Sequence, residues 1–386
     1  MIETTRTGVP LELGAYRQAF REWLAGHAAE YGTALDASED EVFSRGLTLS
    51  NSMWRAGWKQ MGWARAVGGL GGGPRHRATY YDELCRAGIE VPDTDLSIEV
   101  IGPALLHYSP ALAEQYLPAL LAGEESWAQA FSEPDAGSDL AGLRTRGIVA
   151  TGGDLVVSGQ KVWTSHGHLA QRLLVLIRTG TAESRHRGLS AVLVDAEDPR
   201  IVRRPLTFAN GKKELSEIFF DDVHVSQGRL VGPVDGGWKV AMHMLQYERG
   251  MYAAQRQAWL TLRLRQLIEH FNVVGAQPGA GAAIARAWLR LQVVRARAIQ
   301  TVRRLDAGDE VGPDSSADKL LLSSAERAVF DAARFAEDSA FTFDASDAPW
   351  RDGWWYSRAS SIFGGSAEIQ RTLIADRVLG LPRSDR

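Results

Sequence analysis

The sequence predicts a mainly α-helical protein with a β domain inserted into it, and three observations lead to this fold class. Over residues 11–123, apolar side chains recur at intervals of three and four, which is the period of a helix. Over 127–234, short β-prone runs are separated by Gly, Asp, Ser and Pro. Beyond 235 the helical period returns in long segments. The predicted domains are an N-terminal helical domain (1–125), a central β domain, barrel or sandwich (126–235) and a C-terminal four-helix bundle (236–386).

Individual elements follow from the same patterns. The N-terminal helices are expected at 16–31, 42–61, 77–88 and 110–123, and the C-terminal helices at 236–271, 282–307, 316–343 and 366–379. The breaks between the C-terminal helices are GAQPGAG, AGDEVGPDSS and ASDAPWRDGWW. Strands are expected within RGIVAT, DLVVSG, RLLVLIRT, LSAVLVDA, EIFFDDVHV and GRLVG. Because no helix fits between these strands, an antiparallel sheet, sandwich or barrel is favoured over a Rossmann unit.

Composition excludes several classes of protein. The chain has 386 residues, 45% of them hydrophobic, which is enough to bury a large core. A net charge of −4 without a basic block argues against a nucleic-acid partner and against an electrostatically held membrane surface. One cysteine, Cys85, excludes an intramolecular disulfide and is expected to be a small buried side chain. No signal peptide and no run of apolar residues long enough to span a bilayer are visible, so a soluble cytoplasmic protein is expected.

One acid lies where the helical pattern requires an apolar residue. On the face of the helix that carries Glu248, the neighbours are Met244, Leu245, Met251 and Tyr252. A carboxylate in such a stripe is costly unless it is paired or protonated. Two interpretations follow from the residues alone: a core acid paired with an Arg from elsewhere in the chain, or a general base whose pKa is raised by burial.

Two sequence stretches in the β domain combine turn residues with polar side chains. WAQAFSEPDAGSDLAGLRTR begins as an apolar strand, and the hydroxyls of Ser132 and Ser138 with the open backbone of Gly137 suit a planar polar ring with an anionic tail. The simpler interpretation is a turn. In GQKVWTSHG, Trp163 and Ser165 point the same way on an extended strand and could stack on a ring and donate to it. The simpler interpretation is a core tryptophan.

A third stretch of this kind lies near the C-terminus. Gly364 and Gly365 precede Ser366, which is expected to be the N-cap of a helix, and amides at such a helix start favour negative charge. An ordinary capped helix is the alternative. No zinc motif, nucleophile elbow or Walker loop is present, and no metal site is predicted.

These phrases in this order resemble the acyl-CoA dehydrogenase family over essentially the whole chain. The matching stretches are QAFSEPDAGSDL, GQKVWTS, EIFFDDVHVSQGRLVGPVDGGW, the helix containing YERG, and GGSAEIQRTLIADRVLG. The resemblance implies an FAD enzyme that oxidises an acyl-CoA to the 2-enoyl thioester, with the flavin between the β domain and the bundle.

By position in those motifs, the resemblance implies a set of site residues. The cofactor-binding residues would be Phe131, Ser132, Gly137, Ser138, Trp163, Ser165, Ser366 and Glu368, and the substrate-binding residues Ser138, Tyr247 and Arg249.

The family places its catalytic glutamate either before the final glycine-containing turn or in the first helix of the bundle. Here the first place is Gly364, which cannot act as a base, and the second is Glu248. The resemblance therefore implies that Glu248 takes the α-proton while hydride passes from the β-carbon to flavin N5. The Gly364 amide and a flavin ribityl hydroxyl would hold the thioester oxygen. Glycine at 364 is expected to leave room for a branched or bulky acyl group.

Two segments depart from the family pattern. Residues 268–283 and 340–355 lack the Arg and the Gln-then-glycine segments that reach across a homodimer to the adenine half of FAD. The ending FGGSAEIQRTLIADRVLGLPR and the phrase SDLAGLRTR resemble actinobacterial enzymes of steroid side-chain degradation, which are α₂β₂ heterotetramers. The expected partners are therefore an acyl-CoA, an electron-transfer flavoprotein as acceptor, and either a second copy or a second dehydrogenase-like chain.

Two other functions on the same fold remain open from the sequence. A non-catalytic partner subunit would lack the base or the flavin motif. A flavin-dependent monooxygenase or N-hydroxylase would need no base for an α-proton. Glu248 and the SEPDAGSD stretch argue against the non-catalytic subunit, and Glu248 alone argues against the monooxygenase.

Overall fold

A computed structural model of the chain describes residues 7–31, 39–336 and 348–382. The contacts divide the chain into two compact units. We call residues 37–70 and 92–247 the sheet unit, and residues 1–36, 71–91 and 248–386 the helical unit. Helix α6, Gly237–Val274, contributes its first residues to the sheet unit and the rest to the helical unit.

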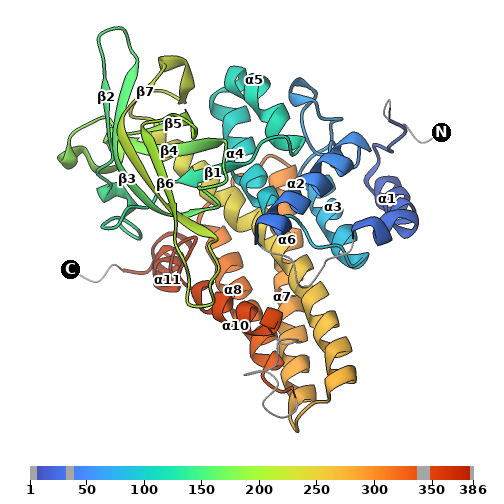
Figure 1. Cartoon of the computed structure of the whole chain (residues 1–386). Coiled ribbons are helices and arrows are strands. Elements are labelled where there is room, and N and C mark those ends of the chain that lie inside the picture. Colours follow the sequence, from blue (N-terminus) through green and yellow to red (C-terminus); the bar gives the residue numbers. More distant parts are fainter. Residues whose placement is uncertain (1–6, 32–38, 337–347, 383–386) are drawn as a thin grey trace. The chain divides into compact units, whose positions relative to one another are not determined.

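The sheet unit is built on one mixed sheet. Its strands are β1 Trp127–Ala130, β2 Arg146–Val149, β3 Leu155–Ser165, β4 Arg172–Arg178, β5 Leu189–Asp195, β6 Ile201–Pro205, β7 Leu215–Val225 and β8 Leu230–Val231. Their order is β6-β7-β3-β2-β4-β5-β8, with β1 paired to β4. Strands β1 to β7 are labelled in Figure 1. Most pairs are antiparallel, but β1 and β2 each pair with β4 in parallel, so the expectation of a purely antiparallel sheet is wrong at these two pairings.

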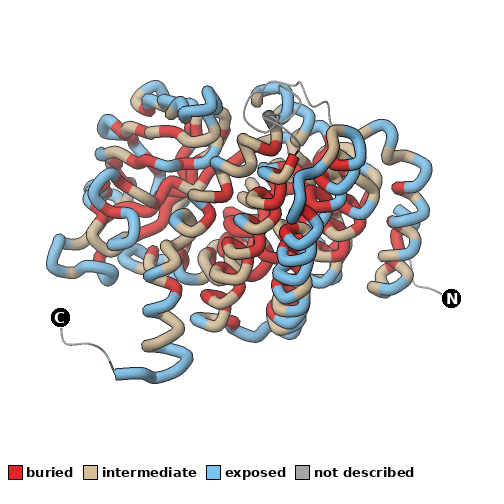
Figure 2. Tube along the Cα trace, turned by 90° about the horizontal axis from the view of Figure 1, so that it is seen from below, coloured by how far each residue is buried: buried red, intermediate tan, exposed pale blue. Residues whose placement is uncertain are grey.

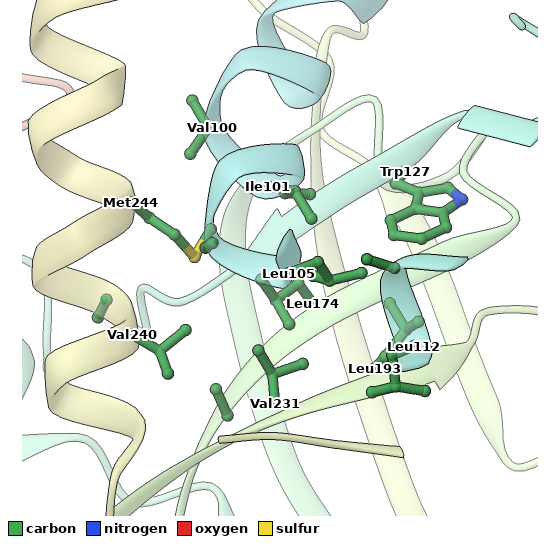
Figure 3. Close-up of a cluster of buried hydrophobic side chains, with 14 of the residues drawn as sticks. Val100, Ile101, Leu105, Leu112, Trp127, Leu174, Leu193, Val231, Val240 and Met244 are labelled. Atoms are coloured by element: carbon green, nitrogen blue, oxygen red, sulfur yellow. The ribbon is translucent and has the colours of Figure 1, made fainter. Parts of the chain in front are cut away.

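Strand β4 shows why its sequence, RLLVLIR, is apolar without alternation. Leu174 and Leu176 pack into one core cluster, while Leu173, Val175 and Ile177 pack into a second. The first cluster joins the sheet to helices α4 and α5 and to Val240 and Met244 of α6 (Figure 3). The second lies among the strands themselves. Because successive side chains point to opposite faces, a strand covered on both faces must be apolar throughout.

Three further helices belong to the sheet unit: α2 Glu39–Arg55, α4 Thr94–Tyr108 and α5 Pro110–Leu121. Helix α4 is not among the helices predicted from periodicity. Its buried positions run on consecutively from Ile98 to Leu105, so it has no polar face to mark the helical period.

The helical unit contains α1 Leu13–His27, α3 Pro74–Arg86, most of α6, α7 Ala280–Asp306, α8 Ser315–Ala333, α10 Ala348–Ala359 and α11 Ala367–Leu373. Buried positions recur along these helices at helical spacing (Figure 2). Charged pairs join some of the helices: Arg297 of α7 to Asp318 of α8, and Arg256 of α6 to Glu326 of α8.

The fold class predicted from the sequence, helical segments on either side of a β domain, is confirmed, with three corrections in the C-terminal helices. Helix α8 ends at Ala333 and residues 334–336 are not helical, while 337–343 lie outside the described residues. The predicted break ASDAPWRDGWW contains helix α10, because Trp350 is buried and Gly353 allows close packing on Phe330. The last helix is shorter than expected: α11 ends at Leu373 and a π-helical turn, Ile374–Val378, follows.

Candidate active site

Glu248 lies on α6, half-buried, between Met244 and Met251, which are both fully buried. The apolar stripe predicted around it is therefore present. Burial raises the pKa of the Glu248 carboxyl, and the positive charges of Lys319 and Arg249 act in the opposite direction. No hydrogen bond from a described residue contributes to this shift.

A glycine turn faces the Glu248 carboxyl within the helical unit. Gly364 has φ +63, and a Cβ built on it would lie 2.9 Å from Glu248 Oε1 and 3.5 Å from Lys319 Nζ. The carboxylate and the ammonium therefore approach the open side of this glycine, where the acyl group is expected to fit. Only a residue without a side chain fits this backbone conformation and this spacing.

Gln370 of α11 holds the same turn. Its side chain is fully buried, and its amide nitrogen donates to the carbonyls of Gly364 and Gly365, both at 3.3 Å. Ser366 is the N-cap of α11, as predicted, and its hydroxyl accepts a hydrogen bond from the Ile369 amide at 3.3 Å. Glu368 is exposed on the first turn of α11, 3.7 Å from Arg371.

Arg249 also approaches this turn. Its Nη2 lies 3.9 Å from the position of a Cβ on Gly365, and its Nε is buried without a hydrogen-bond partner among the described residues. The Oε1 atom of Gln370 is also buried and has no hydrogen-bond partner among the described residues. Tyr247 belongs to the sheet unit, where its ring lies 5.2 Å from the ring of His243.

In the sheet unit, a buried ion pair fixes the loop that follows β1. Lys161 Nζ donates to the Phe131 carbonyl at 3.0 Å and to Glu133 Oε1 at 2.7 Å. Glu133 also accepts from the amides of Arg144 and Thr145, at 2.6 and 2.8 Å. Burial acts to raise the pKa of the Glu133 carboxyl, but Lys161 and these hydrogen bonds hold it below its usual value. The Ser132 carbonyl accepts from the Val162 amide, so loop and strand are joined at consecutive residues.

Trp163 has an unusual conformation on β3. Its φ is +59 and its side chain is 58% exposed, at a register shift between Lys161 and Thr164. A bulky residue in the left-handed region is strained, and such strain concentrates at functional sites. Ser165 is also exposed, while Thr164 between them is buried with its hydroxyl unpartnered among the described residues.

The end of the SEPDAGSD loop is open. Gly137 and Ser138 are both exposed, and no atom lies within 4 Å of the position of a Cβ on Gly137. The predicted site residues thus fall into two sets, each within its own unit. The helical unit holds Glu248, Arg249, Gly364, Ser366 and Glu368, and the sheet unit holds Phe131, Ser132, Gly137, Ser138, Trp163, Ser165 and Tyr247.

Four polar residues at these sites were not predicted from the sequence: Lys319, Gln370, Glu133 and Lys161. All are buried. Burial of a charged or amide side chain depends on contacts with distant residues, so the local pattern does not show it. One compositional signal points to the lysines. Basic residues number 43, only six of them lysines, and three of these, Lys59, Lys161 and Lys319, are buried.

Neither a metal site nor a membrane-spanning helix is found among the residues that the structure describes. Within residues 7–31, 39–336 and 348–382, no cluster of three or more His, Cys, Asp or Glu side chains could hold a metal ion. Among the described helices, none is both long enough and apolar enough to cross a membrane. Of the two segments that depart from the family pattern, residues 268–283 join the end of α6 to the start of α7, and 340–347 lie outside the described residues.

Comparison with family models gives three matches that together span most of the chain. The models are those of the acyl-CoA dehydrogenase N-terminal domain (residues 12–124), middle domain (128–223) and C-terminal domain (235–379).

Comparison with individual proteins gives the same family. Acyl-CoA dehydrogenase IpdE1 of Mycolicibacterium smegmatis is 34% identical over 97% of this chain and 99% of that protein. A chain of the ChsE4-ChsE5 complex from Mycobacterium tuberculosis is 25% identical with a TM-score of 0.77, covering 95% of this chain and 98% of that one. The Tcur3481-Tcur3483 steroid ACAD shares the fold, with a TM-score of 0.78 at 24% identity over 97% of this chain and 99% of that one.

Proposed function

The chain belongs to the acyl-CoA dehydrogenase family, whose members use a flavin, and from that premise we propose that Glu248 is the base that removes the α-proton of an acyl-CoA thioester. The enzyme is an acyl-CoA dehydrogenase, an oxidoreductase acting on a carbon–carbon bond. The assignment of its base, its cofactor contacts and its substrate is our proposal.

One observation carries the assignment of the base: a carboxyl whose pKa is raised by burial faces a glycine turn. A general base works best when its pKa approaches the working pH, and a positioned base contributes about 10² to 10⁴ in rate. The other family position for the base is Gly364, which has no side chain. Glu248 is therefore the acid of the helical unit that combines the right chemistry with the right motif.

We assign the Gly364 amide to the thioester oxygen. The enolate that forms when the α-proton leaves needs a hydrogen-bond donor that is already in place. Gln370 fixes this turn through the carbonyls of Gly364 and Gly365. Removing one such donor typically costs about 10² to 10³ in rate.

The residues present fit an FAD. In the sheet unit, the exposed and strained Trp163, next to a buried Thr164 hydroxyl that has no described partner, suits stacking on a planar ring. In the helical unit, Arg249 Nε and Gln370 Oε1 are buried without a described partner and suit the hydrogen-bonding edge of such a ring. When bound, FAD accepts the hydride that leaves the β-carbon.

We assign specific contacts to the cofactor. The backbone of Phe131 and Ser132, with Trp163 and Ser165, would face the ring. Gly137 and Ser138 would hold the phosphates, and Ser366 and Glu368 would contact the cofactor from α11.

We further propose that the acyl group is bulky and steroid-derived, that the acceptor is an electron-transfer flavoprotein, and that the chain works in a heteromer with a second dehydrogenase-like chain. The support is the ending FGGSAEIQRTLIADRVLGLPR, together with the departure at 268–283 from the family's adenine-binding pattern. The chain purified alone should bind less than one FAD per protomer, as measured by flavin absorbance after gel filtration. A homo-oligomer with one FAD per protomer would contradict the heteromer.

The experiment for the proposed base is anaerobic addition of straight, branched and steroid-derived acyl-CoAs to the FAD-loaded full-length chain, followed by flavin absorbance. Bleaching is expected with at least one thioester, and Glu248→Gln should slow it by about 10² to 10⁴ because the base is lost. The matched control is Glu269→Gln, an exposed acid on the same helix, which should bleach at the wild-type rate. Wild-type bleaching by Glu248→Gln would contradict the assignment, and oxygen-dependent modification of a second substrate without bleaching would indicate a monooxygenase.

A further inference from the structure

Lys319 occupies a position beside the proposed base that no motif assigns. It lies on α8 and is only 6% exposed. Its Nζ is 4.1 Å from the centre of the Phe363 ring, and its Nζ and Cε lie 3.5 and 3.6 Å from the position of a Cβ on Gly364. The ammonium therefore lies over the Phe363 ring and close to the glycine turn that the Glu248 carboxyl also approaches.

The other acid near Lys319 already has a partner. Glu326, two turns along α8, is 1% exposed and bonded to Arg256 of α6. Arg256 in turn stands over the ring of Trp259 at 3.9 Å. Because Glu326 and Arg256 neutralise each other, the charges left at the turn are those of Glu248, Lys319 and Arg249.

Burial lowers the pKa of Lys319 to about 8, while Glu248 first and then Glu326 act to raise it. Its ammonium is thus kept in an unfavourable environment. A buried charge is held in place by the groups that it balances, and its loss leaves those groups uncompensated. Lysine supplies a compact charge at this position in a chain whose basic residues are mostly arginine.

We propose that Lys319 is a positioning residue for the reaction, whose ammonium holds the Glu248 carboxylate at the open side of Gly364 and balances its charge. This inference rests on the proposed function, since it assigns Lys319 a role through the base. Lys319 acts on Glu248 and exchanges no proton with the substrate.

The first test is the pH profile of kcat/KM for acyl-CoA-dependent flavin reduction by Lys319→Met. An adjacent opposite charge typically lowers a carboxyl pKa by about 1 to 3 pH units. Removing the Lys319 charge should therefore move the acidic limb of the pH profile to higher pH by about 1 pH unit or more. At pH values below the wild-type limb, kcat/KM of the variant should be lower by about tenfold for each pH unit by which the limb has moved. The buried lysine Lys59, which pairs with Asp95 in the sheet unit, gives the matched control: Lys59→Met should leave the limb in place.

The second test needs neither flavin nor substrate. Unfolding by denaturant near neutral pH is compared for the wild type, Lys319→Met, Glu248→Gln and the double variant. If the two side chains interact, Lys319→Met should lower the denaturant midpoint more in the wild type than in the Glu248→Gln background. Lys319→Gln serves in the same comparisons if the methionine variant does not fold.

The outcomes separate this inference from the proposed function. An unmoved acidic limb together with additive midpoints in a folded Lys319 variant would overturn the role of the lysine, even if Glu248→Gln is inactive. Undiminished activity of Glu248→Gln would overturn the proposed base, and the role of the lysine with it. A raised limb with non-additive midpoints supports both.

Discussion

Each unit contains a glutamate beside a buried lysine, yet the two glutamates differ in nearly every other respect. In the sheet unit, Glu133 and Lys161 are 2.7 Å apart, and two backbone amides also donate to the carboxylate. In the helical unit, Glu248 receives no hydrogen bond from a described residue that affects its pKa, and Lys319 acts on it only by its charge. The pKa of the first carboxyl is lowered and that of the second is raised.

The difference separates a structural ion pair from a base. Burial acts in the same direction on both carboxyls, toward a higher pKa. Three donors outweigh burial at Glu133, so its charge is fixed and its role is to hold the loop after β1. At Glu248 burial outweighs two cations that are not hydrogen-bonded to it, so the carboxyl can take up a proton. What decides between the two roles is the number of direct donors, not the presence of a lysine.

Removing the lysine of the structural pair should have the largest effect on stability. Lys161→Met leaves Glu133 buried without its cation, and breaking such a pair typically costs about 3 to 5 kcal/mol in the free energy of unfolding. Denaturant unfolding of Lys161→Met and Lys319→Met measures the contrast, with the smaller loss expected for the second. A cost for Lys161→Met no larger than for Lys319→Met would remove the distinction between the two sites. Adding Glu133→Gln to Lys161→Met should restore part of the loss, because the unpaired charge is then gone.

The contact between Gly364 and Glu248 gives a smaller effect. Gly364→Ala places a side chain in the left-handed region, which lowers the free energy of unfolding by about 1 to 2 kcal/mol. The added Cβ also comes too close to Glu248 Oε1, which lowers it further. Gly308, with φ +81 and no atom within 4 Å of its Cβ position, is the matched control for the backbone strain alone. We expect Gly364→Ala to lower the unfolding free energy more than Gly308→Ala, and to slow flavin reduction. Equal losses in the two variants would show that Glu248 does not lie against this glycine.

The sequence predicts Glu248 more readily than the residues that act on it. The acid interrupts an apolar stripe on one helix, which is a local pattern. Lys319 lies in SADKLLLSS, where a lysine beside leucines resembles a surface residue with an apolar stem. Its burial depends on Phe363, which is 44 residues further along the chain. Tertiary contacts of this kind are not visible in a local pattern.

The same limit applies to the fold. The order of helical and β segments follows from periodicity, and it is confirmed. The parallel pairing of β1 with β4 could not be predicted, because register between distant strands leaves no local trace. The local sequence of α10 predicts a break, since Pro349 and Gly353 have low helix propensity. The stability of this helix comes from packing, with Trp350 against Phe330 and His270.

The dependence of stability on pH gives the subtlest contrast between the two glutamates. The folded-state pKa of Glu248 is raised above the usual 4.5, so its contribution to stability is present in full below pH 4.5 and is lost as pH rises through the folded pKa. The folded-state pKa of Glu133 is lowered, so its contribution is present above pH 4.5 and is lost as pH falls through the folded value. Unfolding free energies of the wild type, Glu248→Gln and Glu133→Gln across this range measure both slopes. As pH falls toward 4.5, the unfolding free energy of the wild type should rise relative to that of Glu248→Gln. Over the same range, the difference in unfolding free energy between the wild type and Glu133→Gln should stay constant. Two parallel slopes would mean that both acids are structural, and the proposed base would then have to be sought elsewhere in the chain.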